Sequence, residues 1–253
     1  MGNLSERLME ELACETVFSF SVGGYQIDVL ESTVVSWIVM AVILIFCLIF
    51  GTNLKVHNPG KRQVIAEFIV TWLENFVSDM IGPEGTRYVP YLVSVLLYIG
   101  LANLIGLFGF KPPTKDLNVT IALAVMSILL VQGACIRSKG VWGWVKNFSH
   151  PMWVVTPINL LELIIRPLSL CMRLFGNVLG AFVIMELIKC IVPVGIPVIF
   201  SAYFDIFDGL IQAYVFVFLT SLYLKEVIET EPGEATPKKA KTKNKKKALQ
   251  ANA

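Results

Sequence analysis

Five apolar stretches constrain the fold of this chain more than any other feature. Each is close to the roughly 20 residues that an α-helix needs to cross the hydrocarbon core of a membrane. In chain order they are residues 34–50, 88–108, 119–136, 168–192 and 198–224. Only 16% of the 253 residues are charged, whereas soluble domains contain about 25%. The sequence therefore predicts an all-α membrane protein with five membrane helices and excludes an ordinary soluble domain.

Basic residues are distributed unevenly over the connections between these stretches. They gather after the first, third and fifth stretches, as Lys55, Lys61, Arg62, Arg87, Arg137, Lys139, Lys146 and the lysines of residues 238–247. Such connections lie on the cytoplasmic side of a membrane. We therefore expect an external N-terminal segment at residues 1–33, a membrane domain at 34–230 and a disordered basic cytoplasmic tail at 231–253.

A sixth helix is predicted between the first two stretches. Apolar residues recur there at helical spacing from Val64 to Met80, and charged residues such as Glu67 and Glu74 lie on the opposite face. Because the segment carries several charges, we expect it to lie at the cytoplasmic interface or against another membrane subunit. An ordinary surface helix would show the same pattern and remains an alternative.

Arg173 is the most unusual residue, because it lies inside the fourth stretch with no other charge within three residues. An arginine at the centre of a membrane helix costs roughly 2.5 to 3.5 kcal/mol on insertion scales, so such residues normally line functional pathways. If residues 159–192 form one helix, a polar stripe runs along one of its faces. The stripe consists of Glu162, Arg166, Ser169, Arg173, Asn177 and Gly180.

A second polar line is predicted on the last helix, where Asp205, Asp208 and Gln212 share a face at α-helical spacing. The short connection at residues 193–197 allows only an antiparallel arrangement, so the two polar lines face a common region. A helix over residues 159–192 is roughly 50 Å long and must tilt or kink. We therefore expect the last two helices to form a long tilted hairpin.

Other polar residues in the apolar stretches have simpler explanations. Asn103 is predicted to form a hydrogen bond between helices, and Asp116 to cap the third membrane helix. Glu186 and Lys189 lie on the back of the Arg173 helix, where they could pair with each other or line an external vestibule.

An ion pair within the chain is one explanation for Arg173, with Asp205 or Asp208 as its partner. However, Arg173 lies farther from the hairpin connection than either aspartate, and the difference in depth is roughly 12 Å or more. We therefore expect the carboxylate that meets Arg173 to come from another chain.

Three segments of the sequence resemble subunit a of the F-type ATP synthase membrane sector. They are Pro167-Leu-Ser-Leu-Cys-Met-Arg173-Leu-Phe-Gly-Asn177, Gln212-Ala-Tyr-Val-Phe and Asp116-Leu-Asn-Val-Thr120, and the resemblance covers about residues 15–229. It implies the stator half of a rotary motor in a bacterial plasma membrane. In that family the arginine, here Arg173, faces the essential carboxylates of a ring of c subunits. The implied partners are the c-subunit ring, the b-subunit peripheral stalk, the rest of the synthase and membrane lipids.

The resemblance also implies two offset half-channels for H⁺ or Na⁺. The external one would be lined by Asp205, Asp208, Asn177, Gln212 and Glu186, and the cytoplasmic one by Glu162, Asn159 and Ser169. Phe182 departs from the family pattern, because many relatives carry glutamate or histidine nine residues after the arginine. Glu186, one turn farther on, is the candidate replacement.

Two other classes of protein are alternatives to an ATP synthase subunit. An ion-coupled secondary transporter could use Arg173 to bind an anionic substrate, but the internal repeat typical of such transporters is missing. A structural scaffold would have little reason to keep a charged stripe in hydrocarbon. The sequence contains no phosphate-binding glycine loop, metal cluster or activated nucleophile. We therefore predict no catalytic site, no cofactor, no metal and no nucleic-acid partner.

Overall fold

The computed structural model describes residues 16–22, 25–52, 55, 60–108, 110–148, 156–191, 200 and 203–228. Two strands open this part of the chain, β1 (Thr16–Val22) and β2 (Tyr25–Leu30). The long helices are α2 (Glu31–Gly51), α3 (Lys61–Ile81), α4 (Val89–Leu104), α5 (Leu117–Phe148), α6 (Thr156–Ile191) and α8 (Gly209–Ile228). The predicted tail at 231–253 and the connection at 193–197 lie outside the described residues.

Within the described residues, five helical segments are long and apolar enough to cross a membrane, as predicted. They are Glu31–Gly51, Pro83–Phe108, Leu117–Ser138, Thr156–Met185 and Ile206–Ile228. The fourth begins twelve residues before the predicted start at 168, because Glu162 and Arg166 belong to the same helix as Arg173. The chain is therefore an all-α multi-pass protein in its membrane part.

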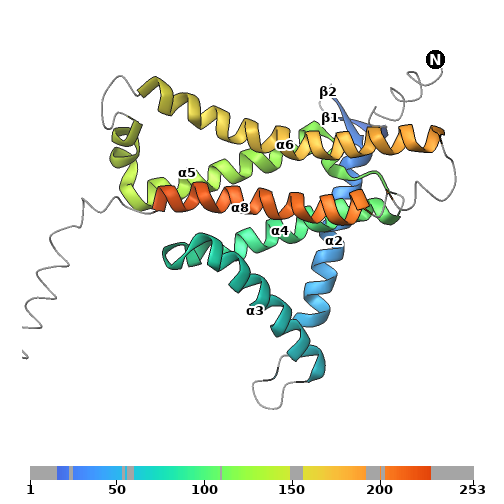
Figure 1. Cartoon of the computed structure of the whole chain (residues 1–253), viewed down its shortest axis with the longest axis horizontal. Coiled ribbons are helices and arrows are strands. Elements are labelled where there is room, and N and C mark those ends of the chain that lie inside the picture. The colour runs from blue at the N-terminus through green and yellow to red at the C-terminus, as the bar shows by residue number, and fades with distance from the viewer. Residues whose placement is uncertain are drawn as a thin grey trace, which may run out of the picture.

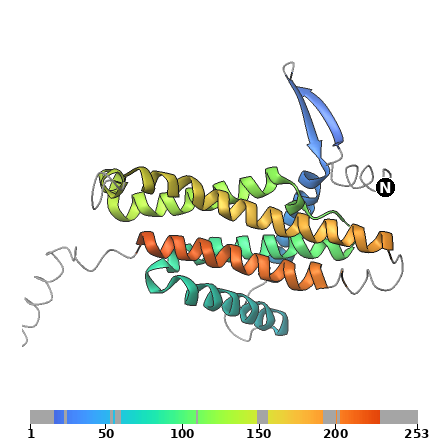
Figure 2. The same cartoon turned by 45° about the horizontal axis from the view of Figure 1, so that its top comes forward.

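Four helices lie side by side and form the body of the molecule. Figures 1 and 2 show α4, α5, α6 and α8 running alongside one another. In Figure 1, α2 crosses them steeply and α3 slants away from them. Leu92 and Ile99 of α4, Leu174 of α6, and Phe216 and Val217 of α8 are almost fully buried between these helices. Apolar side chains buried in this way supply the main packing contacts between the helices.

Short breaks separate α3 from α4 and end the membrane part of α5. Helix α3 ends at Ile81 and is capped by Gly82, whose φ of 81° lies in the left-handed region that favours glycine. Pro83 then begins a 3₁₀ turn, η1 (Pro83–Tyr88), that leads into α4. Gly140 has a φ of 75° and interrupts α5. The apolar part of α5 therefore ends at Ser138, close to the predicted position of 136.

A β-hairpin precedes the first membrane helix and was not predicted. Strands β1 and β2 pair antiparallel, with Val22 opposite Tyr25 and Ser19 opposite Asp28. The hairpin projects from the helical body (Figure 2). Its sequence signal was present, because Phe-Ser-Phe-Ser-Val at residues 18–22 alternates apolar and polar residues before a Gly-Gly pair, which is typical of a hairpin.

Buried polar side chains tie α2, α4 and α8 to the connection before α5. Ser32 Oγ of α2 donates a 2.6 Å hydrogen bond to Asp116 Oδ2, and the other carboxylate oxygen accepts from the backbone N–H of Asn118 at 2.9 Å. Asp116 thus caps α5, as predicted. Asn103 of α4 donates from Nδ2 to the carbonyl of Gly209 at 3.0 Å, and its Oδ1 accepts from Thr114 Oγ1 at 2.8 Å. The predicted role of Asn103 between helices is confirmed.

Candidate ion-translocation site

Two pairs of polar side chains join α6 to α8. Asn177 Nδ2 donates a 2.7 Å hydrogen bond to Gln212 Oε1, and the guanidinium of Arg166 binds the carboxylate of Glu226. Residue numbers rise along α6 while those of the partners fall along α8, so the two helices run antiparallel. The polar stripe of α6 and Gln212 of α8 therefore lie along one line of contact, which we call the α6–α8 seam.

Arg173 lies between these two pairs and is exposed. Among the side chains that the structure describes, it makes no hydrogen bond or ion pair. The register of the seam places Arg173 about opposite Val217, nine residues from Asp208, which is roughly 14 Å along a helix. Asp208 therefore does not neutralise Arg173. The side chain of Asp205 lies outside the described part.

Asp208 closes a single π-helical turn, Tyr203–Asp208, directly before α8. It is partly buried, and its carboxylate has no hydrogen-bond or ion-pair partner among the described residues. A π turn is wider than an α turn, so the face calculated from α-helical spacing holds from Asp208 to Gln212 but not back to Asp205. Such turns are frequent at functional sites.

Gln212 is almost completely buried, with 2% of its surface exposed. Its oxygen accepts from Asn177, whereas its Nε2 finds no acceptor within the described part of the chain. Buried amide groups are normally satisfied. Gln212 therefore offers a free donor beside Asn177.

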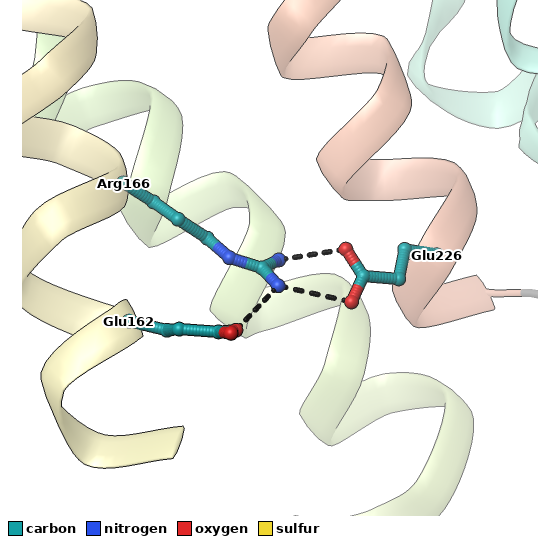
Figure 3. Close-up of polar contacts among 3 residues, drawn as sticks. All are labelled: Glu162, Arg166 and Glu226. Atoms are coloured by element: carbon teal, nitrogen blue, oxygen red, sulfur yellow. Dashed lines mark hydrogen bonds and ion pairs between the residues drawn. The ribbon is translucent and has the colours of Figure 1, made fainter. Parts of the chain in front are cut away.

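Three charged side chains gather at the other end of the seam, and we call them the Arg166 cluster. The guanidinium of Arg166 donates to both carboxylate oxygens of Glu226, at 2.8 and 2.9 Å, and to Glu162 at 2.8 Å. Figure 3 shows the side chain of Arg166 reaching from α6 across to α8, with Glu162 beside it. The guanidinium also lies 5.1 Å from the ring of Tyr223. Sequence reasoning missed Glu226, because it lies 60 residues from Arg166 and no local pattern links the two.

The remaining predicted site residues lie at other positions along α6. Ser169 is exposed on α6, and Asn159 is partly exposed and takes part in an interaction of its own. The side chain of Glu186 lies outside the described residues. Phe182 carries a contact that was not predicted, because Lys115 Nζ lies 3.6 Å from its ring centroid. A lysine that is only 7% exposed is thus partly accommodated by an aromatic face.

The family model described as "ATP synthase A chain" matches residues 33–225. The chain belongs to this family. "ATP synthase subunit a" of Moorella thermoacetica is 32% identical over 203 residues, which cover 80% of this chain and 92% of that protein. "ATP synthase subunit a 2" of Syntrophotalea carbinolica is 36% identical, over 77% of this chain and 84% of its own length. "ATP synthase subunit a, sodium ion specific" of Propionigenium modestum is 30% identical, over 80% of this chain and 75% of its own length.

Membership of the ATP synthase subunit a family agrees with the resemblance recognised in the sequence. Subunit a belongs to the membrane sector of the complex rather than to its catalytic part, which fits a non-catalytic role. The remainder of the synthase is the partner that this membership implies. The five apolar helices agree with a multi-pass membrane protein.

Proposed function

We propose that this chain is the ion-translocating stator subunit of a rotary F-type ATP synthase. The observation that carries the proposal is Arg173, an exposed cation in a membrane-spanning helix without a partner among the described residues. An intramembrane charge normally faces an aqueous cavity or a partner charge. The partner is a carboxylate on each subunit of the c-ring, which passes α6 as the ring turns.

The chemistry of Arg173 follows from its permanent charge. Guanidinium does not lose its proton in proteins, so it favours the ionised form of any carboxylate that comes near it. A c-ring carboxylate that reaches Arg173 therefore releases its H⁺ or Na⁺. The ion cannot pass Arg173 directly, and its transport is coupled to rotation.

Two half-channels meet the ring on either side of Arg173. The external one is lined by Asp208, Asp205, Asn177, Gln212 and Glu186, and the unpaired carboxylate of Asp208 in its π turn supports this side. The cytoplasmic one is lined by Glu162, Asn159 and Ser169, and the exposed carboxylate of Glu162 supports that side. The polar contacts of the seam separate the two routes.

The orientation follows from the basic connections, with the N-terminus outside and the C-terminus in the cytoplasm. Residues 1–33 form the external segment, 34–230 the membrane domain and 231–253 the cytoplasmic tail. Helix α6 has 36 residues and would be roughly 54 Å long if straight, so it tilts strongly in a core of about 30 Å. The steep crossing of α2 over the other helices supports a tilted α6–α8 hairpin (Figure 1).

Exposed apolar side chains on α2 and α3 support contacts with lipid and with another membrane subunit. Phe68 and Trp72 of α3 and Leu44 of α2 are all more than half exposed. Helix α3 lies at the cytoplasmic interface, where such side chains contact lipid or another subunit. The b-subunit peripheral stalk and membrane lipids are the partners that we assign to these faces.

The test is Arg173→Ala in the assembled synthase, reconstituted in vesicles. We expect ion-driven ATP synthesis to be abolished while the complex remains intact, with exposed Arg87→Ala in η1 as the matched control. Coupled synthesis at the wild-type rate in Arg173→Ala would refute the proposal. So would uptake of an anionic substrate by vesicles that contain this chain alone, which would indicate a secondary transporter.

A further inference from the structure

A small cavity lies behind the Arg166 cluster, between α5, α6 and α8. It is lined by Ser127 of α5, Arg166, Pro167 and Leu170 of α6, and Thr220 and Tyr223 of α8. Ser127 is 2% exposed, and its hydroxyl lies close to that of Tyr91 on α4. The guanidinium of Arg166 stands between this almost wholly apolar cavity inside the chain and the carboxylates outside it.

In the Arg166 cluster the two carboxylates are more exposed than the guanidinium. The side chain of Arg166 is 23% exposed, whereas those of Glu162 and Glu226 are 51% and 60% exposed. Exposed ion pairs contribute little to folding stability. The carboxylates are thus accessible to ions, while the sheltered guanidinium fixes their positions through three hydrogen bonds.

We propose that Arg166 is a positioning residue that sets the electrostatic charge of the cytoplasmic ion exit. This inference rests on the function proposed above. One guanidinium and two carboxylates leave the Arg166 cluster with a single net negative charge. That charge is enough to draw a cation away from the neighbourhood of Arg173, two helical turns along α6, and small enough to release it to the cytoplasm.

The charge of the cluster can be changed stepwise by substitution. Arg166→Gln leaves two unbalanced carboxylates, and Glu226→Gln leaves a neutral pair of Arg166 and Glu162. The double variant Arg166→Gln/Glu226→Gln restores the single negative charge of the native cluster without its guanidinium and keeps Glu162. Arg137 and Lys225, the cations near the same ends of α5 and α8, are unchanged in every variant.

The experiment measures ATP synthesis by the assembled synthase in inverted vesicles, where the cytoplasmic side faces the medium. H⁺ or Na⁺ in the medium, whichever drives synthesis, is varied to find the concentration that halves the rate. We expect this concentration to fall about tenfold in Arg166→Gln, because an added negative charge nearby retains a cation more tightly. It should rise in Glu226→Gln and return close to the native value in the double variant.

The inside of an inverted vesicle corresponds to the external side of the membrane. The dependence of the ATP synthesis rate on the ion concentration inside the vesicle should not change in any variant. If Arg166 only holds α6 and α8 together, its loss would change the ion dependence of ATP synthesis on both sides of the membrane, or would impair assembly alone. If the three variants share the native half-inhibition concentration, or if only the external dependence changes, the inference is overturned. Should Arg166→Gln fail to assemble, Glu226→Gln still tests the charge, because it leaves no carboxylate unpaired.

Arg173→Ala in the same vesicles separates this inference from the proposed function. Loss of synthesis in Arg173→Ala together with native behaviour of the three variants would overturn only the role of Arg166. Native synthesis in Arg173→Ala would overturn the proposed function itself.

Discussion

Asn177 on α6 donates a 2.7 Å hydrogen bond to the side-chain oxygen of Gln212 on α8. Asn177 is exposed and Gln212 is buried, so the inner partner fixes the orientation of the outer one. The pair lies one helical turn from Arg173. This hydrogen bond holds the two polar lines together at the point where the proposed external half-channel meets the ring.

Removing the Asn177 side chain alone should destabilise the protein more than removing both Asn177 and Gln212. Asn177→Leu leaves the buried amide of Gln212 without any described partner, which costs about 1 to 3 kcal/mol. Asn177→Leu/Gln212→Leu removes both polar groups and should be closer to native stability. Thermal release of subunit a from the purified complex measures this difference. Ser94→Ala, which removes a bond within α4 only, is the control, and equal melting temperatures for the single and double variants would contradict the prediction.

Asp208→Asn should slow ion uptake without disturbing assembly. The substitution keeps the size of the side chain but removes a charge that draws cations towards the external half-channel. We expect the transport rate at low external ion concentration to fall roughly tenfold, with recovery at high concentration. Asp205→Ala should act in the same direction. Glu84→Gln, on an exposed turn, serves as the charge-matched control, and unchanged rates at low concentration would count against an uptake role.

Gly209→Ala should destabilise the contact between α4 and α8. A Cβ at this position would lie 2.8 Å from the Cβ of Asn103, so the helices must move apart and strain the Asn103 hydrogen bond to the Gly209 carbonyl. Overpacking of this kind costs about 1 to 3 kcal/mol. At Gly100 the nearest atoms would lie at 4.0 Å, so Gly100→Ala should be neutral or slightly stabilising. The melting temperatures of the two variants test this contrast, and a common value would disprove it.

Ser32→Ala should loosen α2 from the rest of the molecule. It removes the 2.6 Å hydrogen bond to the buried carboxylate of Asp116, and hydrogen bonds to charged groups contribute about 1.5 to 3 kcal/mol. Faster amide hydrogen exchange at the start of α2 is the expected readout. Thr52→Ala, which removes only a hydrogen bond at the exposed end of α2, should leave the exchange there unchanged. Native exchange in Ser32→Ala would show that Asp116 does not hold α2.

The membrane helices could be predicted from sequence because the signal is local. A run of about 20 apolar residues has few structures open to it in lipid, and Arg173 stands out against such a background. The roles of Asn103 and Asp116 followed from equally local rules for helix contacts and caps. The structure describes the predicted helix between the first two spans as α3, and its interfacial position remains a proposal.

Features that depend on distant contacts escaped prediction. Glu226 could be paired with Arg166 only once the register of α6 against α8 was known, and Lys115 could be placed on Phe182 only once α6 lay beside the connection before α5. The π turn at Tyr203–Asp208 also went unpredicted, because α-helical spacing was assumed up to Gln212. The β-hairpin is different, since its alternating pattern was visible in the sequence.

The π turn before α8 also bears on how the length of this segment can vary. It holds one residue more than an α-helical path over the same distance, so deleting any residue between 203 and 208 would let an ordinary helix form. Because the wider turn takes up the surplus residue, the flanking residues would keep their orientation relative to Gln212 after such a deletion. A one-residue gap in this short segment should therefore be better tolerated during evolution than a one-residue gap within α8, where it would rotate one half of the helix by about 100° relative to the other.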